Sequence, residues 1–439
     1  MLSMIGLIVG LTLLIVFTMR GMNLLVAAPL CALFVAVMSG LPLFPQMVAE
    51  GEINFLTSYM GGFTGFIMAW FPMFLLGAIF GKVMEDSGAA DSVSKWIVSK
   101  LGLKYAVLAI VAACAILTYG GVSLFVVAFS VYPMALSLFK EADLPRRFIP
   151  AALAFGSVTF TMTSAGSPEI QNWIPMEYMD TNQYAGWEVS ILVAVFMMIF
   201  GYWWLKRMIN KAVNKGERFK AREDDPTMVD RALPNPFMGL IPLVVVLIIS
   251  YIFHHDLGTS ALIIALLSGI IATYLLNRKY FSNVSKALSD GTIGALIAIG
   301  NTAAVVGFGG VAKAVPAFTT AVDAMASIPG SPLIGGAVAV SVIAGMTGSA
   351  SGGQTIALPL LAPGYIEAGV NQEALHRTVA ISSGALDSLP HNGYVVTTIR
   401  GICGETHKEA YGPVAVVSVI VPLIGLAIAI ALFSIGLGI

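Results

Sequence analysis

Charged residues and cysteines are scarce in this chain of 439 residues. Only 11% of the residues are Asp, Glu, Lys or Arg, whereas 57% are hydrophobic and the mean hydropathy is +0.87. These proportions exclude an ordinary soluble protein and indicate a membrane protein with several spans. Cys31, Cys114 and Cys403 lie far apart, so they form no metal-ligand or redox spacing. We expect them to pack in the interior, and we expect no metal or other cofactor.

The N-terminus lacks a basic segment ahead of its first apolar run, and no small-residue cleavage site follows that run. We therefore expect residues 4–19 to stay as a membrane span rather than to be removed as a signal peptide. Other apolar segments approach the roughly 20 residues that a spanning helix needs. They cover residues 24–43, 63–83, 189–205, 237–253, 260–276, 293–311 and 414–437.

Small polar residues interrupt the apolar segments at residues 118–123 and 163–169, and again, about 230 residues later, at 347–354 and 387–392. A bilayer core tolerates unwound backbone only where protein or water satisfies its polar groups. Paired interruptions in two halves of a chain are typical of secondary transporters, whose binding site lies between two repeats. We therefore predict a binding site made by these four breaks.

Residues that match between the two halves at offsets of 228 to 230 positions indicate an internal duplication. The matched pairs are Phe80 with Phe308, Thr118 with Thr347, Pro133 with Pro363, and Arg147 with Arg377. We predict an all-α fold of two repeats, each with five spans and one re-entrant hairpin. Because five crossings are an odd number, the second repeat is inverted relative to the first.

The positions of lysine and arginine predict the orientation in the membrane. In this arrangement, all of the 23 lysines and arginines except Lys313 and Arg377 fall on the cytoplasmic side. Both termini then lie outside, and the polar residues 209–235 form a cytoplasmic linker between a first repeat, 1–208, and a second repeat, 236–439. Amphipathic stretches at 91–101 and 315–328 are expected to lie along the membrane surface.

Charge does not distinguish a hairpin from two full spans at residues 104–140 and 333–366, because both return the chain to the same side. The turns around Gly120 and Ser349 contain no charged residue, which favours hairpins.

The breaks contain hydroxyl, amide and glycine residues that can bind an anion. No Lys or Arg is predicted within the apolar depth, whereas each short helix that ends at a break directs free N–H groups and about half a positive charge toward the midplane. A carboxylate can therefore bind there without a cationic side chain. The candidate substrate ligands are Tyr119, Gly120, Gly121, Ser123, Thr163, Ser164, Ser167, Thr347, Ser349, Ser351, Gln354, Ser388, His391 and Asn392.

Three ionisable residues, Glu169, Asp387 and His391, occur at the breaks. An ionised carboxylate at the centre of a membrane helix costs roughly 2.5–3.5 kcal/mol, so such residues usually pair, protonate or bind ions. We regard all three as candidates for proton coupling, and His391 also as a substrate ligand. The alternative is a buried hydrogen-bonded pair that only fixes the shape of the break.

An intramembrane hydrolase that uses Ser388, Asp387 and His391 is a further alternative. No Gly-x-Ser-x-Gly elbow occurs, and a hydrolase gives no reason for the duplication. We therefore predict no catalytic residues and no enzyme activity. A passive anion channel is a second minor alternative.

The segment 385–393 (ALDSLPHNG), the segment 119–123 (YGGVS) and the full-length organisation resemble gluconate permeases of the GntP type, within the larger ion-transporter superfamily. The segment 385–393 is more similar to the branch of hydroxybutyrate permeases than to the sugar-acid branch. The resemblance implies a homodimer in the cytoplasmic membrane that takes up a small organic acid anion with protons and has no nucleic-acid partner.

The resemblance also implies an elevator mechanism, with scaffold spans at 4–43 and 237–277 and a moving transport part at 62–185 and 291–400. The expected substrate is a hydroxylated monocarboxylate such as 3-hydroxybutyrate or gluconate. Sodium-coupled dicarboxylate relatives use a Ser-Asn-Thr motif at both tips, which neither 163–165 nor 348–350 contains. Sodium coupling is therefore the alternative and proton coupling the expectation.

Overall fold

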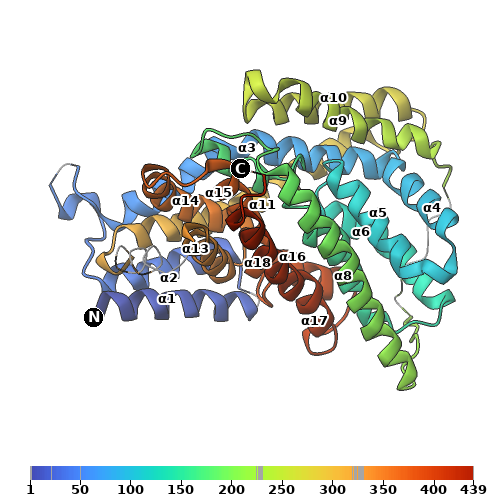
Figure 1. Ribbon diagram of the computed structural model, residues 1–439, viewed down its shortest axis with the longest axis horizontal. Helices are drawn as coiled ribbons and strands as arrows, with labels where there is room; N and C mark the ends of the chain where they lie inside the picture. The colour runs from blue at the N-terminus through green and yellow to red at the C-terminus, as the bar shows by residue number, and fades with distance from the viewer. Residues whose placement is uncertain are drawn as a thin grey trace.

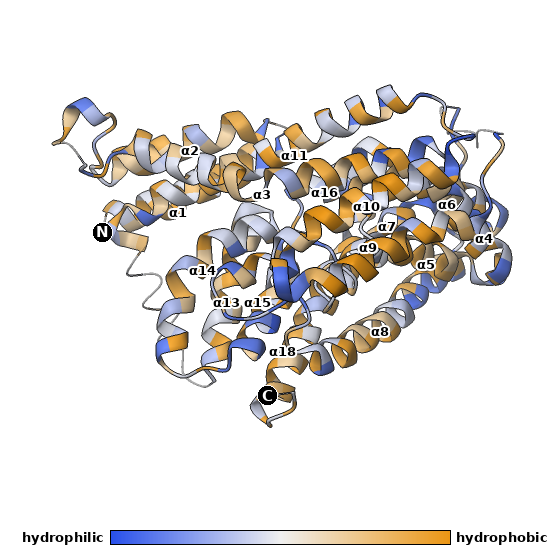
Figure 2. Ribbon diagram, turned by 90° about the horizontal axis from the view of Figure 1, so that it is seen from above, coloured by the Kyte–Doolittle hydropathy of each residue, from blue (hydrophilic) through white to orange (hydrophobic). Residues whose placement is uncertain are grey.

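The computed structural model describes residues 2–20, 22–49, 51–223, 225, 231–318, 320, 324 and 331–438. Helices are the regular elements of this part of the chain, as the sequence predicts (Figure 1). Within it, seven helices are long and apolar enough to cross a membrane, or eight if the bent pair at 89–119 counts as one span. In Figure 2 the long helices α8 and α9 are largely apolar along their length, and exposed hydrophobic side chains such as Ile199 and Tyr251 belong to them.

The helices of the first half precede the linker. They are α1 (Leu2–Met19), α2 (Leu24–Met38), α3 (Phe55–Asp86), α4 (Ala89–Leu101), α5 (Ala106–Tyr119), α6 (Leu124–Glu141), α7 (Ile149–Ala154) and α8 (Trp187–Asn214). Those of the second half are α9 (Pro236–Leu257), α10 (Ser260–Asn277), α11 (Val284–Lys313), α13 (Pro332–Thr347), α14 (Ala350–Glu367), α15 (Gln372–Leu386), α16 (Gly393–Val396), α17 (His407–Ala415) and α18 (Val421–Ser434).

One helix of each half has the same length and the same position of a proline. The helices α6 and α14 both have 18 residues, begin after a serine, and contain proline at the tenth position. These helix ends place Pro133 opposite Pro359 rather than opposite Pro363, with which the sequence analysis matched it. The cause is that the separation between equivalent residues shortens along the repeat, from 228 at Phe80 to 226 at Pro133, as loop lengths differ.

The helices α5 and α13 are short. They have 14 and 16 residues, which at 1.5 Å per residue correspond to about 21 and 24 Å, less than the ~30 Å of a bilayer core. Each packs against the helix that follows it, α6 or α14. The preceding helix α4 is bent by 108° from α5 and buries one side through residues such as Val93 and Ile97. Its expected counterpart at 315–328 lies largely outside the described residues.

The longest helices, α3 and α11, lie side by side (Figure 1). Glycine permits this close contact, because a Cβ at Gly62 would lie 2.5 Å from the carbonyl oxygen of Val306, and one at Gly310 would lie 2.3 Å from that of Ser58. The helices α1 and α2 pack together and α2 packs against α11, while α9 and α10 pack together and α10 packs against α3. The two outer pairs therefore flank the α3 and α11 contact.

The linker after α8 contacts both halves through a network of ion pairs. Glu405, which follows the second break, lies within 2.9 Å of both Arg146 Nε and Arg222 Nη2, and its side chain is only 3% exposed. Arg146 also pairs with Asp225 at 2.8 Å. The linker thereby joins the start of α7 in the first half to the segment before α17 in the second.

A more exposed ion pair lies beside this network. The Arg147 guanidinium binds both carboxylate oxygens of Glu217 at 2.8 and 3.0 Å, and these hydrogen bonds hold the pKa of Glu217 below its ordinary value. Both side chains are partly open to solvent, so screening by water weakens the pair.

We predict that Glu405→Gln lowers the free energy of unfolding by about 2–4 kcal/mol, because it leaves two arginines beside a buried neutral group. Thermal unfolding of the purified protein in detergent measures the change. Glu217→Gln is the matched control, with an expected loss below about 1 kcal/mol at its exposed site. Equal losses in the two variants would contradict a special role for the buried network.

Candidate functional site

The interruption at residues 163–169, called the first break from here on, is irregular and buried. A π-helical segment, Phe155–Thr159, follows α7, and the next α-helix is α8. In between, the Ser164 hydroxyl donates to the Phe160 carbonyl, and the Asn172 amide donates to the Met162 carbonyl at 2.9 Å. Thr163, Ser164 and Ser167 are all buried here. Side chains and neighbouring segments thus satisfy part of the polar backbone that the break exposes.

The tip between α5 and α6 contacts this break. The Tyr119 hydroxyl donates to the Ala165 carbonyl at 2.6 Å, and a Cβ on Gly121 would lie 3.4 Å from Pro168 Cγ. Gly120 faces a different element, because its Cβ would lie 2.7 Å from Leu243 Cβ of α9. Ser123 begins α6 without a capping hydrogen bond from its side chain.

The interruption at residues 387–392, called the second break from here on, contacts the tip between α13 and α14. Asn392 begins α16, where its Oδ1 accepts from Val395 N–H at 2.9 Å while its amide donates to the Gly348 carbonyl at 3.0 Å. His391 lies against the same glycine, since a Cβ on Gly348 would lie 2.9 Å from His391 Cδ2. The buried Nε2 of His391 has no hydrogen-bond partner among the described residues. In each half, therefore, a tip contacts a break.

The hydroxyls of the second tip are already engaged. Ser349 caps α14 by accepting from Gly352 N–H at 3.1 Å, and Ser351 Oγ lies 3.4 Å from Ser349 Oγ. The Thr347 hydroxyl donates to the Ala344 carbonyl at 3.2 Å. These contacts stabilise the ends of α13 and α14, so a ligand would have to share or replace them.

Two carboxyl groups stand at the breaks without an ion pair in the described part of the chain. Asp387 is 5% exposed, and its Oδ1 accepts from the Ser388 hydroxyl at 3.1 Å. Glu169 is less buried, and its own N–H donates to Ser167 Oγ at 3.4 Å. The Ser388 carbonyl accepts from the Tyr411 hydroxyl at 3.3 Å.

The two tip-and-break pairs are neighbours. A Cβ on Gly384, three residues before Asp387, would lie 3.1 Å from Thr163 Cγ2 of the first break. The rings of Phe125 in α6 and Tyr394 in α16 meet edge to face with centroids 5.6 Å apart. The structure therefore brings together the four breaks that the sequence analysis grouped.

The Gln354 side chain binds residues of both halves instead of residues of the α13–α14 tip. Its Nε2 donates to the Gln171 carbonyl at 3.0 Å and to the Val379 carbonyl at 3.4 Å. It thus links α14 and α15 of the second half to the first break. The Oε1 atoms of Gln354 and Gln171 are buried and have no hydrogen-bond partner among the described residues.

Arg377 contradicts the expectation that no cation reaches the breaks. The sequence analysis placed it in an external loop, but it lies within α15, is 0% exposed, and donates to the Thr163 carbonyl at 2.6 Å. Its neighbour His376 is also fully buried, with Nδ1 2.8 Å from Thr181 Oγ1. The match with Arg147 was misleading, since Arg147 is partly exposed at the linker. The asparagine cap at Asn371 is the sequence signal that α15 begins before Arg377.

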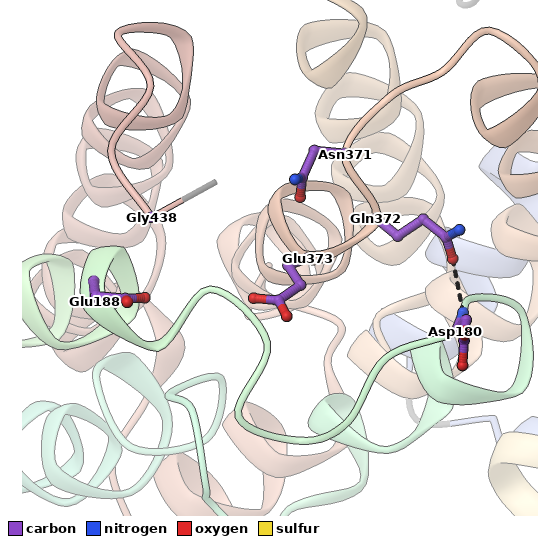
Figure 3. A pocket seen from close by; sticks show the side chains of 6 residues that line it. All are labelled: Asp180, Glu188, Asn371, Gln372, Glu373 and Gly438. Carbon is purple, nitrogen blue, oxygen red and sulfur yellow. Dashed lines mark hydrogen bonds between the residues drawn. The ribbon is translucent and has the colours of Figure 1, made fainter.

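A surface hollow lies elsewhere. It has a volume of about 610 Å³ and is lined by Asp180, Glu188, Asn371, Gln372, Glu373 and Gly438 (Figure 3). The Asp180 N–H donates to Gln372 Oε1 at 2.7 Å across it. None of the predicted site residues lines this hollow, and the described residues hold no group of three or more His, Cys, Asp or Glu side chains suited to a metal ion.

Comparison with known proteins supports the transporter interpretation. The family model for GntP family permeases matches residues 2–436. The uncharacterized transporter YxjC of Bacillus subtilis (strain 168) is 36% identical, with 95% of this chain and 96% of the relative covered. The high-affinity gluconate transporter of Escherichia coli (strain K12) is 27% identical over 157 residues, 35% of this chain and 33% of that protein.

A solved structure has a similar fold. The crystal structure of the YdaH transporter from Alcanivorax borkumensis aligns with a TM-score of 0.55 and covers 94% of this chain and 98% of that one. The sequence identity is 14%, so this likeness concerns the fold alone.

We predict that Gly348→Ala is more destabilising than Gly369→Ala. Both glycines have positive φ, +61° and +73°, so alanine costs roughly 1–2 kcal/mol of backbone strain at either. Only at Gly348 does the added methyl group also displace His391, and we expect about 1 kcal/mol more loss there. Thermal unfolding in detergent measures both, and equal losses would mean that the tip does not depend on His391.

Proposed function

The chain belongs to the GntP family of permeases, and from this premise we propose that it is a proton-coupled symporter that imports a small hydroxylated monocarboxylate. The observation that supports this most strongly is the contact between a tip and a break in each half, Tyr119 with Ala165 and Asn392 with Gly348. Both contacts surround unwound backbone, which in a bilayer is tolerated where it lines a binding site.

We propose that the halves are inverted repeats and that the α5–α6 and α13–α14 pairs are re-entrant hairpins. Their short first helices, the matched lengths of α6 and α14 and the polar tips support this. In this proposal, residues 4–43 and 237–277 form a scaffold, and 62–185 and 291–400 form a part that carries substrate across as an elevator. The glycine-lined contact of α3 with α11 would then lie beside the scaffold pairs.

The proposed substrate site takes the anion on backbone N–H groups and hydroxyls at the breaks. Its members are Tyr119, Gly120, Gly121, Ser123, Thr163, Ser164, Ser167, Thr347, Ser349, Ser351, Gln354, Ser388, His391 and Asn392. 3-Hydroxybutyrate and gluconate fit this chemistry, because each has one carboxylate and at least one hydroxyl. Gluconate is also the substrate in the printed name of the Escherichia coli relative.

Asp387 is the proposed proton carrier, and His391 and Glu169 are further candidates for proton coupling. Carboxyl groups persist inside membranes where they pair, protonate or bind ions. Asp387 has only the Ser388 hydroxyl as a side-chain partner among the described residues, so protonation is its proposed role. A proton on Asp387 would accompany each carboxylate, which keeps the charge that crosses the membrane low.

We predict that proteoliposomes accumulate labelled gluconate or 3-hydroxybutyrate when an inward proton gradient is imposed. Asp387→Asn should lose accumulation while retaining exchange of substrate, because the asparagine holds the site but carries no exchangeable proton. Asp256→Asn, at an exposed position beside the end of α9, is the matched control and should be unchanged. Accumulation that ignores the proton gradient and requires sodium would contradict the proposed coupling.

We predict that a membrane-impermeant maleimide labels Lys215→Cys only from the cytoplasmic side and His255→Cys only from outside. Both positions are exposed, and they lie at opposite ends of the segment that contains α9. The native Cys31, Cys114 and Cys403 are buried, so their background should be low. Labelling of both positions from one side would overturn the inverted arrangement.

The partners in this proposal are the organic acid anion, the proton, the lipid bilayer and a second copy of the chain, within the cytoplasmic membrane and with both termini outside.

A further inference from the structure

Arg377 is a buried cation without a carboxylate partner. Its exposed fraction is 0%, and it makes no ion pair within the described residues. Arg146, the other buried arginine, has two carboxylates within 2.9 Å. An unpaired charge inside a protein is strongly unfavourable, so it persists where hydrogen bonds satisfy it or where a ligand supplies the opposite charge.

The hydrogen bonds of Arg377 all reach the irregular segment of the first half. Its Nε donates to the Ala185 carbonyl at 2.9 Å, and its Nη2 donates to the Gln183 carbonyl at 3.1 Å. Its Nη1 donates at 2.6 Å to both the Thr163 carbonyl and Asn172 Oδ1. These acceptors are dipoles without a formal charge, so they fix the guanidinium but leave its positive charge uncompensated.

This position couples the two halves at the proposed site. Arg377 belongs to α15, the helix that leads into Asp387, whereas its acceptors belong to the first break and the chain that follows it. The planar guanidinium binds several carbonyls at fixed angles, which the single ammonium of lysine does not reproduce. Thr163, a proposed substrate ligand, is therefore held in place by the second half of the chain.

We propose that Arg377 determines the charge of the substrate: it positions the first break through Thr163 and Asn172, and its uncompensated charge makes the site favour one carboxylate. This inference rests on the proposed function. Within the substrate class already proposed, it predicts that the uncharged amide of the same acid binds poorly. One buried cation matches one carboxylate, so a second carboxylate on the substrate would be unfavourable.

Asn172 allows the charge to be tested separately from the structure. Its Oδ1 accepts from Arg377, and its amide donates to the Met162 carbonyl at 2.9 Å. Asn172→Asp keeps an acceptor beside Arg377 but adds the missing negative charge. Asn172→Ala loses both contacts without adding charge. Both variants lose the bond to Met162, so their difference reports the carboxylate beside Arg377, and the comparison of Asn172→Ala with the wild type reports the loss of the amide contacts.

The experiment measures binding of gluconate, 3-hydroxybutyrate and the corresponding amides to purified protein by thermal shift. We expect Asn172→Asp and Arg377→Gln to lower the affinity for the acid by about tenfold or more and to lower the affinity for the amide by less. Asn172→Ala should keep the preference for the acid over the amide, and Arg377→Lys should restore part of the preference lost in Arg377→Gln. Arg147→Gln, at the linker, is a control that should bind as the wild type does.

The outcomes separate this inference from the proposed function. If the wild type binds none of the acids, the proposed function fails. If the wild type binds an acid and Asn172→Asp retains the preference for acid over amide, the proposed function survives and the role of Arg377 is overturned. Should Arg377→Gln fail to fold, the comparison of Asn172→Asp with Asn172→Ala still decides the question.

Discussion

Hydrogen bonding of interrupted backbone, in a chain whose helices are mostly apolar, is the constraint on which the rest of this structure depends. Every N–H and C=O released by a broken helix needs a partner within the protein or a water-filled cavity. At the first break, several of these partners are supplied by Arg377 of the second half and by Asn172 and Tyr119 of the first. In the second, Asn392 and Ser349 do so. These hydrogen bonds lower the free-energy cost of leaving the backbone unwound at the breaks.

The two breaks are satisfied in chemically different ways. The first depends on a cation from the opposite half, and its own side chains are mainly hydroxyls and amides. The second contains Asp387 and His391 and is held by its own tip. An anion site beside Arg377 and a proton site at Asp387 would therefore lie on adjacent segments, joined through α15. In this proposal, α15 would connect the two sites, so that binding of the substrate could affect binding of the proton.

The linker adds a second connection between the halves, outside the apolar region. Glu405 joins Arg146 and Arg222, while Arg231 at the far end of the linker donates to the carbonyl oxygens of Glu85 and Asp86 and pairs with Asp91. The polar segment thus touches the region before the first break, the region after the second break, and the joint between α3 and α4. Its charged residues therefore connect separate parts of the fold.

The sequence by itself determined the class of fold, the family and the location of the breaks. Those features depend on local composition: apolar length predicts spans, and runs of Gly, Ser and Thr interrupt them wherever they occur. Tyr119 and Asn392 are found from the sequence for the same reason, since they belong to the interruptions that they stabilise. Their role in substrate binding stays a prediction. The register of the repeat was less secure, because Pro133 has two candidate partners four residues apart and only the helix ends distinguish Pro359 from Pro363.

Only the tertiary structure decided which segment satisfies each break. Arg377 in a polar sequence resembles a loop residue, and nothing local indicates that its four hydrogen bonds reach Thr163, Asn172, Gln183 and Ala185, about 190 to 215 positions away. Gln354 was predicted at the second tip, yet it donates to Gln171 of the first break. Contacts between distant segments depend on how the halves pack, and packing is a property of the whole chain that local patterns do not contain.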